Sequence, residues 1–146
     1  TKINPDGSLN GNSYESGDEV NQIRWEFLDS AEYQDTLHYY QGLIRFRKQH
    51  AALHLDTSEE VKERLTFFTK QKSGVILFTI NGEGVEGETA KELLFAFNAS
   101  DKAVTLTLPT GEWEVFVCDG KAEMDTLKII SGKMLVSAMD AVYAVR

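Results

Sequence analysis

Residues 104–117 read Val-Thr-Leu-Thr-Leu-Pro-Thr-Gly-Glu-Trp-Glu-Val-Phe-Val. Apolar and polar side chains alternate on both sides of the Pro-Thr-Gly segment, a pattern typical of strands that bury one face. Proline and glycine favour a turn at residues 109–111, because each sets a backbone conformation that turns require. The stretch therefore predicts two short strands joined by a turn.

The same pattern extends over the second half of the chain. From about residue 64 to the end, alternating segments are separated by turn sequences such as Asn81-Gly82 and Ser131-Gly132. Short strands spaced roughly 8–12 residues apart favour an antiparallel β-sandwich over a parallel sheet. The candidate strands cover residues 64–70, 75–81, 92–98, 104–108, 113–118, 126–130, 133–136 and 141–145. Residues 82–91, rich in Gly and Glu, are predicted to form a mobile loop.

The first fifty residues have a different composition. Residues 1–24 are rich in Asn, Gly, Ser and Asp, which predicts a long irregular loop. The start of the chain, Thr-Lys-Ile-Asn-Pro, is expected to be cut out of a longer protein. Residues 30–50 are predicted to form the one strong helix. The apolar side chains of this helix recur at helical spacing: Tyr33, Leu37, Tyr40, Leu43 and Ile44. A face this broad is expected to pack against a larger body.

Bulk composition excludes several classes of function. The 146 residues are 42% hydrophobic and 26% charged, as in ordinary soluble globular proteins. The formal net charge of -8 disfavours nucleic acid and anionic membrane surfaces as partners, but leaves neutral sugars open. No apolar run approaches the ~20 residues that span a bilayer. The sequence does not predict where in the cell, or outside it, the protein works.

The residues give no catalytic or metal site. Residues 6–11 match the first half of a calcium loop, but Gly17 stands where the bidentate Glu belongs, so a polar turn is preferred. The three histidines share no zinc-ligand spacing with Cys118. Glycoside hydrolysis needs two carboxyl groups held across a sugar on rigid elements, and nothing in the sequence supplies that framework. No catalytic residue, metal or cofactor is predicted for this chain.

Four segments resemble a known family. Residues 12–25, Asn-Ser-Tyr-Glu-Ser-Gly-Asp-Glu-Val-Asn-Gln-Ile-Arg-Trp, resemble a segment of type I pullulanases, debranching enzymes of the α-amylase superfamily, although Arg24 replaces the family's usual Asp. Residues 39–50, Tyr-Tyr-Gln-Gly-Leu-Ile-Arg-Phe-Arg-Lys-Gln-His, are similar to the last barrel helix of these enzymes. Residues 93–98 and 105–113 look like their closing β-sandwich.

The resemblance implies the C-terminal part of a pullulanase-type hydrolase that cleaves α-1,6 branches in pullulan, starch or glycogen. The implied fold is mainly β, a C-terminal antiparallel β-sandwich preceded by the rim loop and last α-helix of a (β/α)8 barrel. Residues 1–50 would end the barrel and residues 51–146 would form the sandwich. The three catalytic carboxylates of the family would lie upstream, so this chain alone is expected to be inactive. Its partners would be the α-glucan and the missing N-terminal catalytic barrel, with self-association possible through helix 30–50.

Within the loop, Asp18 and Asn21, then Asn12, are candidate substrate-binding residues by resemblance. Carboxylates and amides hydrogen-bond sugar hydroxyls, but the same residues also cap turns and fix loops. Tyr14 and Trp25 are expected to be core anchors rather than sugar platforms. Two alternatives stay open: a stand-alone polysaccharide-binding β-sandwich, which predicts a row of exposed aromatic side chains, and the C-terminal part of another α-amylase superfamily enzyme.

Overall fold

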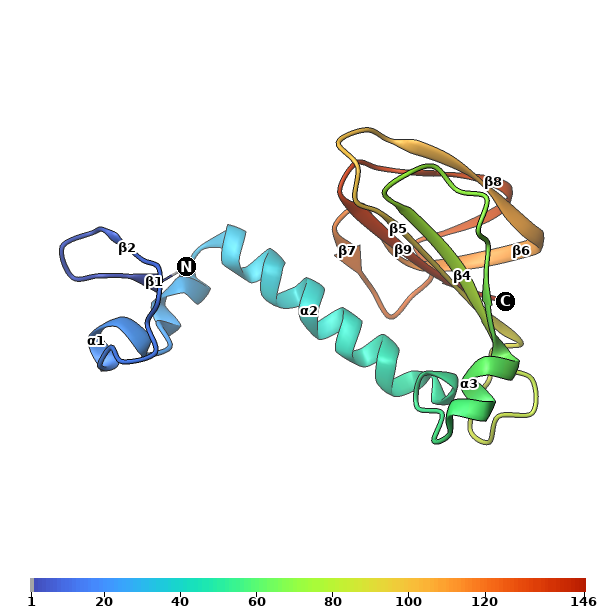
Figure 1. The fold of residues 1–146 in the computed structure, drawn as a ribbon, viewed down its shortest axis with the longest axis horizontal. Coiled ribbons are helices and arrows are strands. Elements are labelled where there is room, and N and C mark those ends of the chain that lie inside the picture. Colours follow the sequence, from blue (N-terminus) through green and yellow to red (C-terminus); the bar gives the residue numbers. More distant parts are fainter. Residues whose placement is uncertain (1) are drawn as a thin grey trace. The chain divides into compact units, whose positions relative to one another are not determined.

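The computed structural model describes residues 2–146 and divides them into two compact units, with the division between Asp35 and Thr36. The division falls within helix α2 (Ala31–Gln49), drawn in light blue to cyan in Figure 1. The boundary predicted at residue 50 refers to a parent enzyme and stays a prediction.

Short elements make up the first unit. Strands β1 (Lys2–Ile3) and β2 (Leu9–Asn10) form an antiparallel hairpin, and α1 (Asp18–Asn21) and the 3-10 helix η1 (Trp25–Asp29) follow. The hairpin turn is held by Asp6, whose carboxylate accepts hydrogen bonds from the amide and hydroxyl of Ser8. These bonds hold the pKa of Asp6 below its ordinary value. The calcium-like sequence thus closes a polar turn.

Helix α2 lies close to the bounds predicted from its periodicity. Gly42 and Phe46 are buried on one side of its second half. Of the five apolar side chains that the spacing placed on one face, four are exposed, namely Tyr33, Leu37, Tyr40 and Ile44. The fifth, Leu43, is half-buried. The 3-10 helix η2 (Ala51–Leu53) and helix α3 (Ser58–Arg64) then lead into the sheet.

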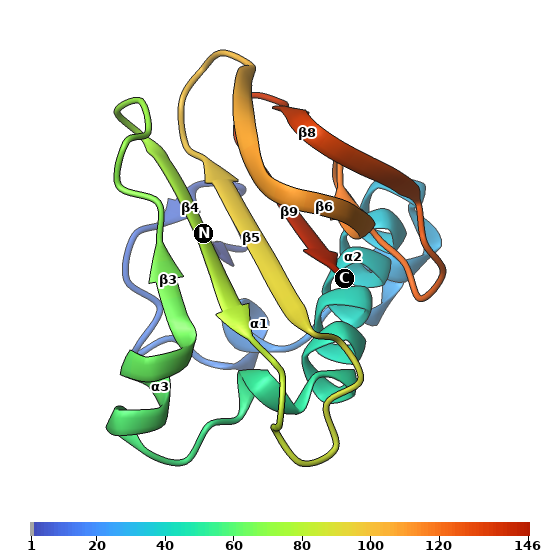
Figure 2. The ribbon, with the colours of Figure 1, turned by 90° about the vertical axis from the view of Figure 1, so that its right-hand side faces the viewer.

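All strands of the second unit pair antiparallel in one seven-stranded sheet (Figures 1 and 2). The sheet order is β3-β4-β5-β9-β6-β7, and β8 pairs with β6. The strands are β3 (Leu65–Phe67), β4 (Val75–Asn81), β5 (Glu92–Asn98), β6 (Val104–Cys118), β7 (Lys121–Ala122), β8 (Lys128–Val136) and β9 (Asp140–Val145). The predicted mainly β, antiparallel class is confirmed. The predicted barrel helix is corrected, because α2 packs through Phe46 on this antiparallel sheet as part of the β domain itself.

Two predicted turns lie inside strands instead. Segments 104–108 and 113–118 form the single strand β6, and residues 128–130 of the predicted segment 126–130 join segment 133–136 in β8. Thr107 pairs with Lys133 and Glu112 with Ser131, so residues 108–111 face Gly132 alone and the strand bends there. Gly111, at φ 132, supplies the backbone conformation for this bend. The bent β6–β8 ribbon turns back over one face of the sheet, as Figure 2 shows.

The sheet buries both of its faces. The inner face packs against the β6–β8 ribbon in a cluster centred on Leu77, Leu94 and Trp113. The outer face packs against the end of α2, where Phe46 contacts the rings of Phe95 and Tyr143. Strand β5 therefore reads as a nearly continuous apolar run, since alternate residues serve different cores.

Helix α2 approaches β7 more closely than a side chain would allow. A Cβ atom placed on Gly42 would lie 2.0 Å from the carbonyl oxygen of Ala122 and 2.6 Å from its Cβ. The glycine in the middle of a helix, normally unfavourable, is explained by this backbone contact.

Candidate functional site

The predicted substrate-binding residues lie together in the first unit, but their side chains do different things. Asn21 donates hydrogen bonds of 2.8 Å to the carbonyl oxygens of Ser13 and Ser16. The Asn12 side-chain oxygen accepts a hydrogen bond from the amide of Tyr14 at 3.2 Å. Both asparagines therefore brace the loop. Asp18 lies in the first turn of α1 with an exposed side chain.

A second asparagine pair ties the hairpin to this loop. Asn10 donates to the side-chain oxygen of Asn4 at 2.8 Å and to the hydroxyl of Ser16 at 3.1 Å. Ser16 is thus held from two directions, by Asn10 through its hydroxyl and by Asn21 through its carbonyl. The Asn- and Ser-rich composition produces a self-braced surface loop, in which Asp18 keeps its carboxylate open to solvent.

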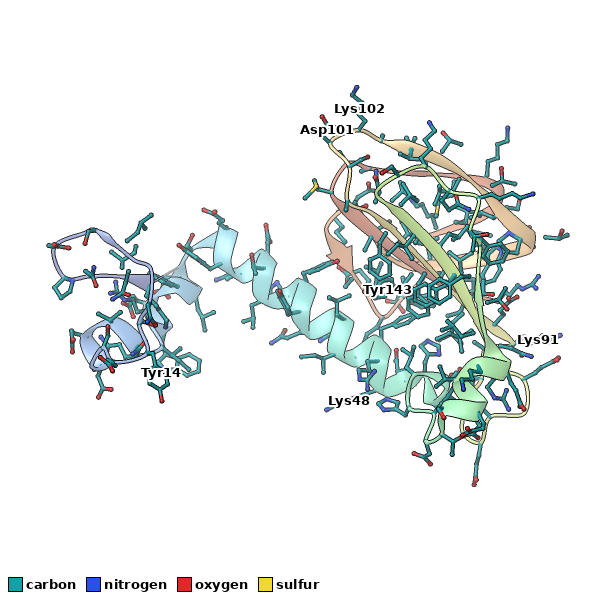
Figure 3. The ribbon with its side chains drawn as sticks, in the orientation of Figure 1. Tyr14, Lys48, Lys91, Asp101, Lys102 and Tyr143 are labelled. Atoms are coloured by element: carbon teal, nitrogen blue, oxygen red, sulfur yellow. The ribbon has the colours of Figure 1, made fainter. Side chains whose placement is uncertain are left out.

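Two aromatic side chains of the same unit point into solvent. Tyr14 is 90% exposed and Trp25 is 70% exposed, and Figure 3 shows Tyr14 directed away from the ribbon. The prediction that both serve as core anchors is wrong for this chain. Among the described residues of this unit, 2–35, the one strongly buried apolar residue is Val20, at 4%, so few apolar contacts hold them together.

The second unit contains an apolar cavity of about 410 Å³ and another of about 350 Å³. The smaller one lies between α2 and the outer sheet face and is lined by Leu43, Phe46, Arg47, Leu53, Phe78, Ile80, Phe95, Phe97 and Tyr143. Burial raises the pKa of the Tyr143 phenol, which Figure 3 shows between the sheet and α2. Such a lining suits apolar side chains rather than hydrolytic chemistry, which needs paired carboxylates.

Residues 2–146 contain neither a metal-ligand cluster nor a helix that could span a membrane. No three His, Cys, Asp or Glu side chains in this range come together as a metal site would require. No helix in the same range has the length and apolar character needed to cross a bilayer. Cys118 is a buried free thiol whose pKa burial raises, which suits a packing residue.

A family model for the C-terminal region of pullulanase-type alpha-1,6-glucosidases matches residues 8–131. The chain belongs to this family. The match runs from the braced loop through α2 into β8.

Known proteins give the same assignment. Pullulanase from Bacillus subtilis (strain 168) is 28% identical over 108 residues, which cover 74% of this chain and 14% of that protein. The structure of pullulanase from Bacillus acidopullulyticus superimposes with a TM-score of 0.84 and 27% identity, covering 94% of this chain and 16% of that one. A Paenibacillus barengoltzii pullulanase, solved in complex with maltohexaose and alpha-cyclodextrin, gives a TM-score of 0.70 and 30% identity over 92% of this chain and 20% of that one. The chain therefore spans a fifth or less of each relative.

Sequence reasoning missed one group of residues in this region. Residues 82–91, predicted as a mobile loop, contain Glu88, whose side chain is fully buried against His50. Neither the loop composition nor the helix-end position of His50 indicates this pairing. The two residues are 38 positions apart, so only the fold brings them together.

Proposed function

We propose that this chain is the C-terminal part of a pullulanase-type glycoside hydrolase that cleaves α-1,6 branches in α-glucans such as pullulan, starch and glycogen. The observation that carries the proposal is the family match over residues 8–131. This chain covers 14–20% of the length of these relatives, so most of each relative corresponds to sequence outside the chain, which can include the catalytic part. The chain itself would contribute structure and part of the substrate rim, but no catalytic carboxylate.

Within the rim, we propose that Asp18 contacts the sugar while Asn12 and Asn21 hold the loop in shape. The exposure of the Asp18 carboxylate and the internal hydrogen bonds of both asparagines support this division. In an enzyme that contains this chain, Asp18→Asn should raise KM for pullulan and leave kcat nearly unchanged, since an outer contact binds ground and transition states alike. Glu19→Gln, the exposed neighbour, serves as control. If Asp18→Asn and Glu19→Gln have the same KM for pullulan, Asp18 does not contact the sugar.

The exposed face of α2, formed by Tyr33, Leu37, Tyr40 and Ile44, is proposed to dock on the catalytic barrel of the same enzyme. Exposed apolar faces of this kind mark interaction surfaces. Each of these side chains is at least 38% exposed. In the isolated chain the same face is expected to mediate self-association, because no other apolar surface of the enzyme is present to cover it.

The alternative, a stand-alone polysaccharide-binding module, predicts an exposed row of aromatic side chains on the sheet. Trp113 is fully buried and Phe95 is 5% exposed, while Phe67, at the sheet edge, is 55% exposed. Most sheet aromatics therefore pack in the two cores, which favours the enzyme-part proposal. The alternative predicts that the isolated chain is retained by amylose or pullulan in affinity electrophoresis, and the enzyme-part proposal predicts free migration.

The proposal is tested by comparing two proteins. The enzyme that contains this chain should release reducing sugar from pullulan, and the isolated chain should release none above a buffer control. If the longer protein does not cleave pullulan and cleaves α-1,4 links instead, the chain is part of another α-amylase superfamily enzyme.

A further inference from the structure

Glu88 has an unusual environment for a surface-loop glutamate. Its side chain is fully buried, and its carboxylate oxygens accept four hydrogen bonds. The imidazole Nδ1 of His50 and the amides of Thr89 and Ala90 donate to Oε1 at 2.9 Å each, and the amide of Ala52 donates to Oε2 at 3.0 Å. A buried carboxylate is stable only when it is hydrogen-bonded in this way.

These donors come from two segments of the chain that are distant in sequence. His50 follows the last residue of α2, and Ala52 lies in η2. Thr89 and Ala90 directly follow Glu88 and precede β5. The His50 ring also packs on the ring of Phe46, with centroids 4.4 Å apart, and Phe46 is the residue through which α2 enters the outer core. Glu88 therefore connects the end of α2 to the segment that leads into β5.

Charge makes this connection sensitive to protonation. Burial raises the pKa of Glu88, but the hydrogen bonds from His50, Ala90 and Ala52 outweigh it, and the pKa lies below its ordinary value. A carboxyl group with a depressed pKa in the folded state stabilises that state above its unfolded pKa, and the stabilisation is lost as the pH falls through the folded pKa. The carboxylate has about four acceptor sites, and a proton bound to it occupies one of them. The protonated Glu88 side chain therefore loses at least one of its four hydrogen bonds.

We propose that His50 and Glu88 form an acid-sensitive clasp that fixes the end of α2 and residues 82–91 on the sandwich. At neutral pH the clasp is closed and η2 and the loop are ordered together. In acid it opens locally, while the two apolar cores remain. The clasp is independent of the proposed enzymatic activity, because it depends only on contacts within residues 36–146.

Other charged groups near these segments bond elsewhere. Arg47 on α2 donates to the carbonyl of Leu53, and the His54 ring donates to the carbonyl of Arg47. Arg64 from α3 donates to the carbonyls of Asn81 and Glu83 in the same loop. The titratable side chain that faces Glu88 is thus His50, and these other bonds involve backbone carbonyls that do not titrate.

Amide hydrogen exchange of the isolated chain, measured by NMR, tests the clasp. At pH 7, Glu88→Gln should speed exchange of the Ala52 and Ala90 amides by roughly tenfold or more, because each loses a charged acceptor. The amide of Val115 in the inner core should keep its wild-type rate. Glu86→Gln, an exposed loop glutamate, is the matched control and should change none of these rates. Equal rates in Glu88→Gln and the control would overturn the proposal.

A second experiment follows the titration of Glu88 and the amide exchange of Ala52 in the wild-type chain. Its result does not depend on whether the Glu88→Gln variant folds. The side-chain carboxyl signal of Glu88 should titrate below the ordinary pH range of glutamate, because its hydrogen bonds lower its pKa. Exchange at Ala52, corrected for its intrinsic pH dependence, should rise over the same pH range. If Glu88 titrates in the ordinary pH range of glutamate, or if exchange at Ala52 does not follow its titration, then the clasp is not acid-sensitive and the proposal fails.

Discussion

Replacing Gly42 by alanine should destabilise the chain, although alanine is the better helix former. Alanine gains about 1 kcal/mol of helix propensity over glycine. Its Cβ, however, would lie 2.0 Å from the carbonyl oxygen of Ala122, where ordinary contacts begin at 3.4 Å. Helix α2 must therefore retreat by about 1.4 Å, and overpacking of this kind costs ~1–3 kcal/mol.

The retreat also lifts Phe46, one helical turn further on, out of the outer core. Full burial of a phenylalanine is worth ~1.5–3 kcal/mol, and a gap near 1 Å forfeits up to about half of its packing energy. Taken with the propensity gain, the expected net loss of unfolding free energy is about 1–3 kcal/mol. This corresponds to a Tm lower by roughly 3–9 °C for a domain of this size.

Urea denaturation followed by tryptophan fluorescence measures this loss, because Trp113 is fully buried in the sandwich. Gln41→Ala, at the exposed neighbouring position, is the control and should stay within about 0.5 kcal/mol of wild type. A Gly42→Ala variant as stable as wild type, or more stable, would refute the close approach of α2 to β7.

Three further results are expected. The isolated chain should release no reducing sugar from pullulan or limit dextrin; release by protein free of contaminating amylase would place catalytic groups within it. Sedimentation should show concentration-dependent dimers that weaken in Leu37→Ser/Ile44→Ser, and a monomer at high concentration would contradict self-association. Asn98→Asp should lower the free energy of unfolding by about 3 kcal/mol or more. The side-chain amide of Asn98 donates to the carbonyls of Lys102 and Ser137 at 2.8 Å each, and an ionised carboxylate would repel both. A urea midpoint equal to that of wild type would show that these bonds do not stabilise the fold.

The hydrophobic pattern predicted the bounds of helices and strands correctly where a whole segment followed one helical or strand period. Strands β4 and β5 have the bounds that alternation and flanking turns predicted, and α2 differs by one residue at each end. The pattern failed at residues 109–111, where turn-forming residues produce a bend inside a paired strand. A bend and a turn need the same backbone conformations, so residue type alone does not distinguish them.

The predicted sugar-binding site stays a prediction, and the structure shows only what its side chains contact within this chain. Asn12 lies in the loop and Asp18 and Asn21 lie in the short helix α1 that follows it. Whether each side chain braces this region or faces solvent depends on which backbone group it reaches. The exposure of Tyr14 was likewise unpredictable, because an aromatic residue is buried only if the fold supplies a partner surface.

The sequence by itself determined the class of the protein: its alternating segments specify antiparallel strands, and its motifs in order specify the pullulanase-type C-terminal family. It also determined that α2 is amphipathic. Only the tertiary structure decided which side of α2 packs on the sheet, why Gly42 is required, and that Glu88 is buried against His50. The physical reason is range: periodicity and turn preference act over a few residues, whereas close backbone approach and burial of a charge depend on segments brought together from distant parts of the chain.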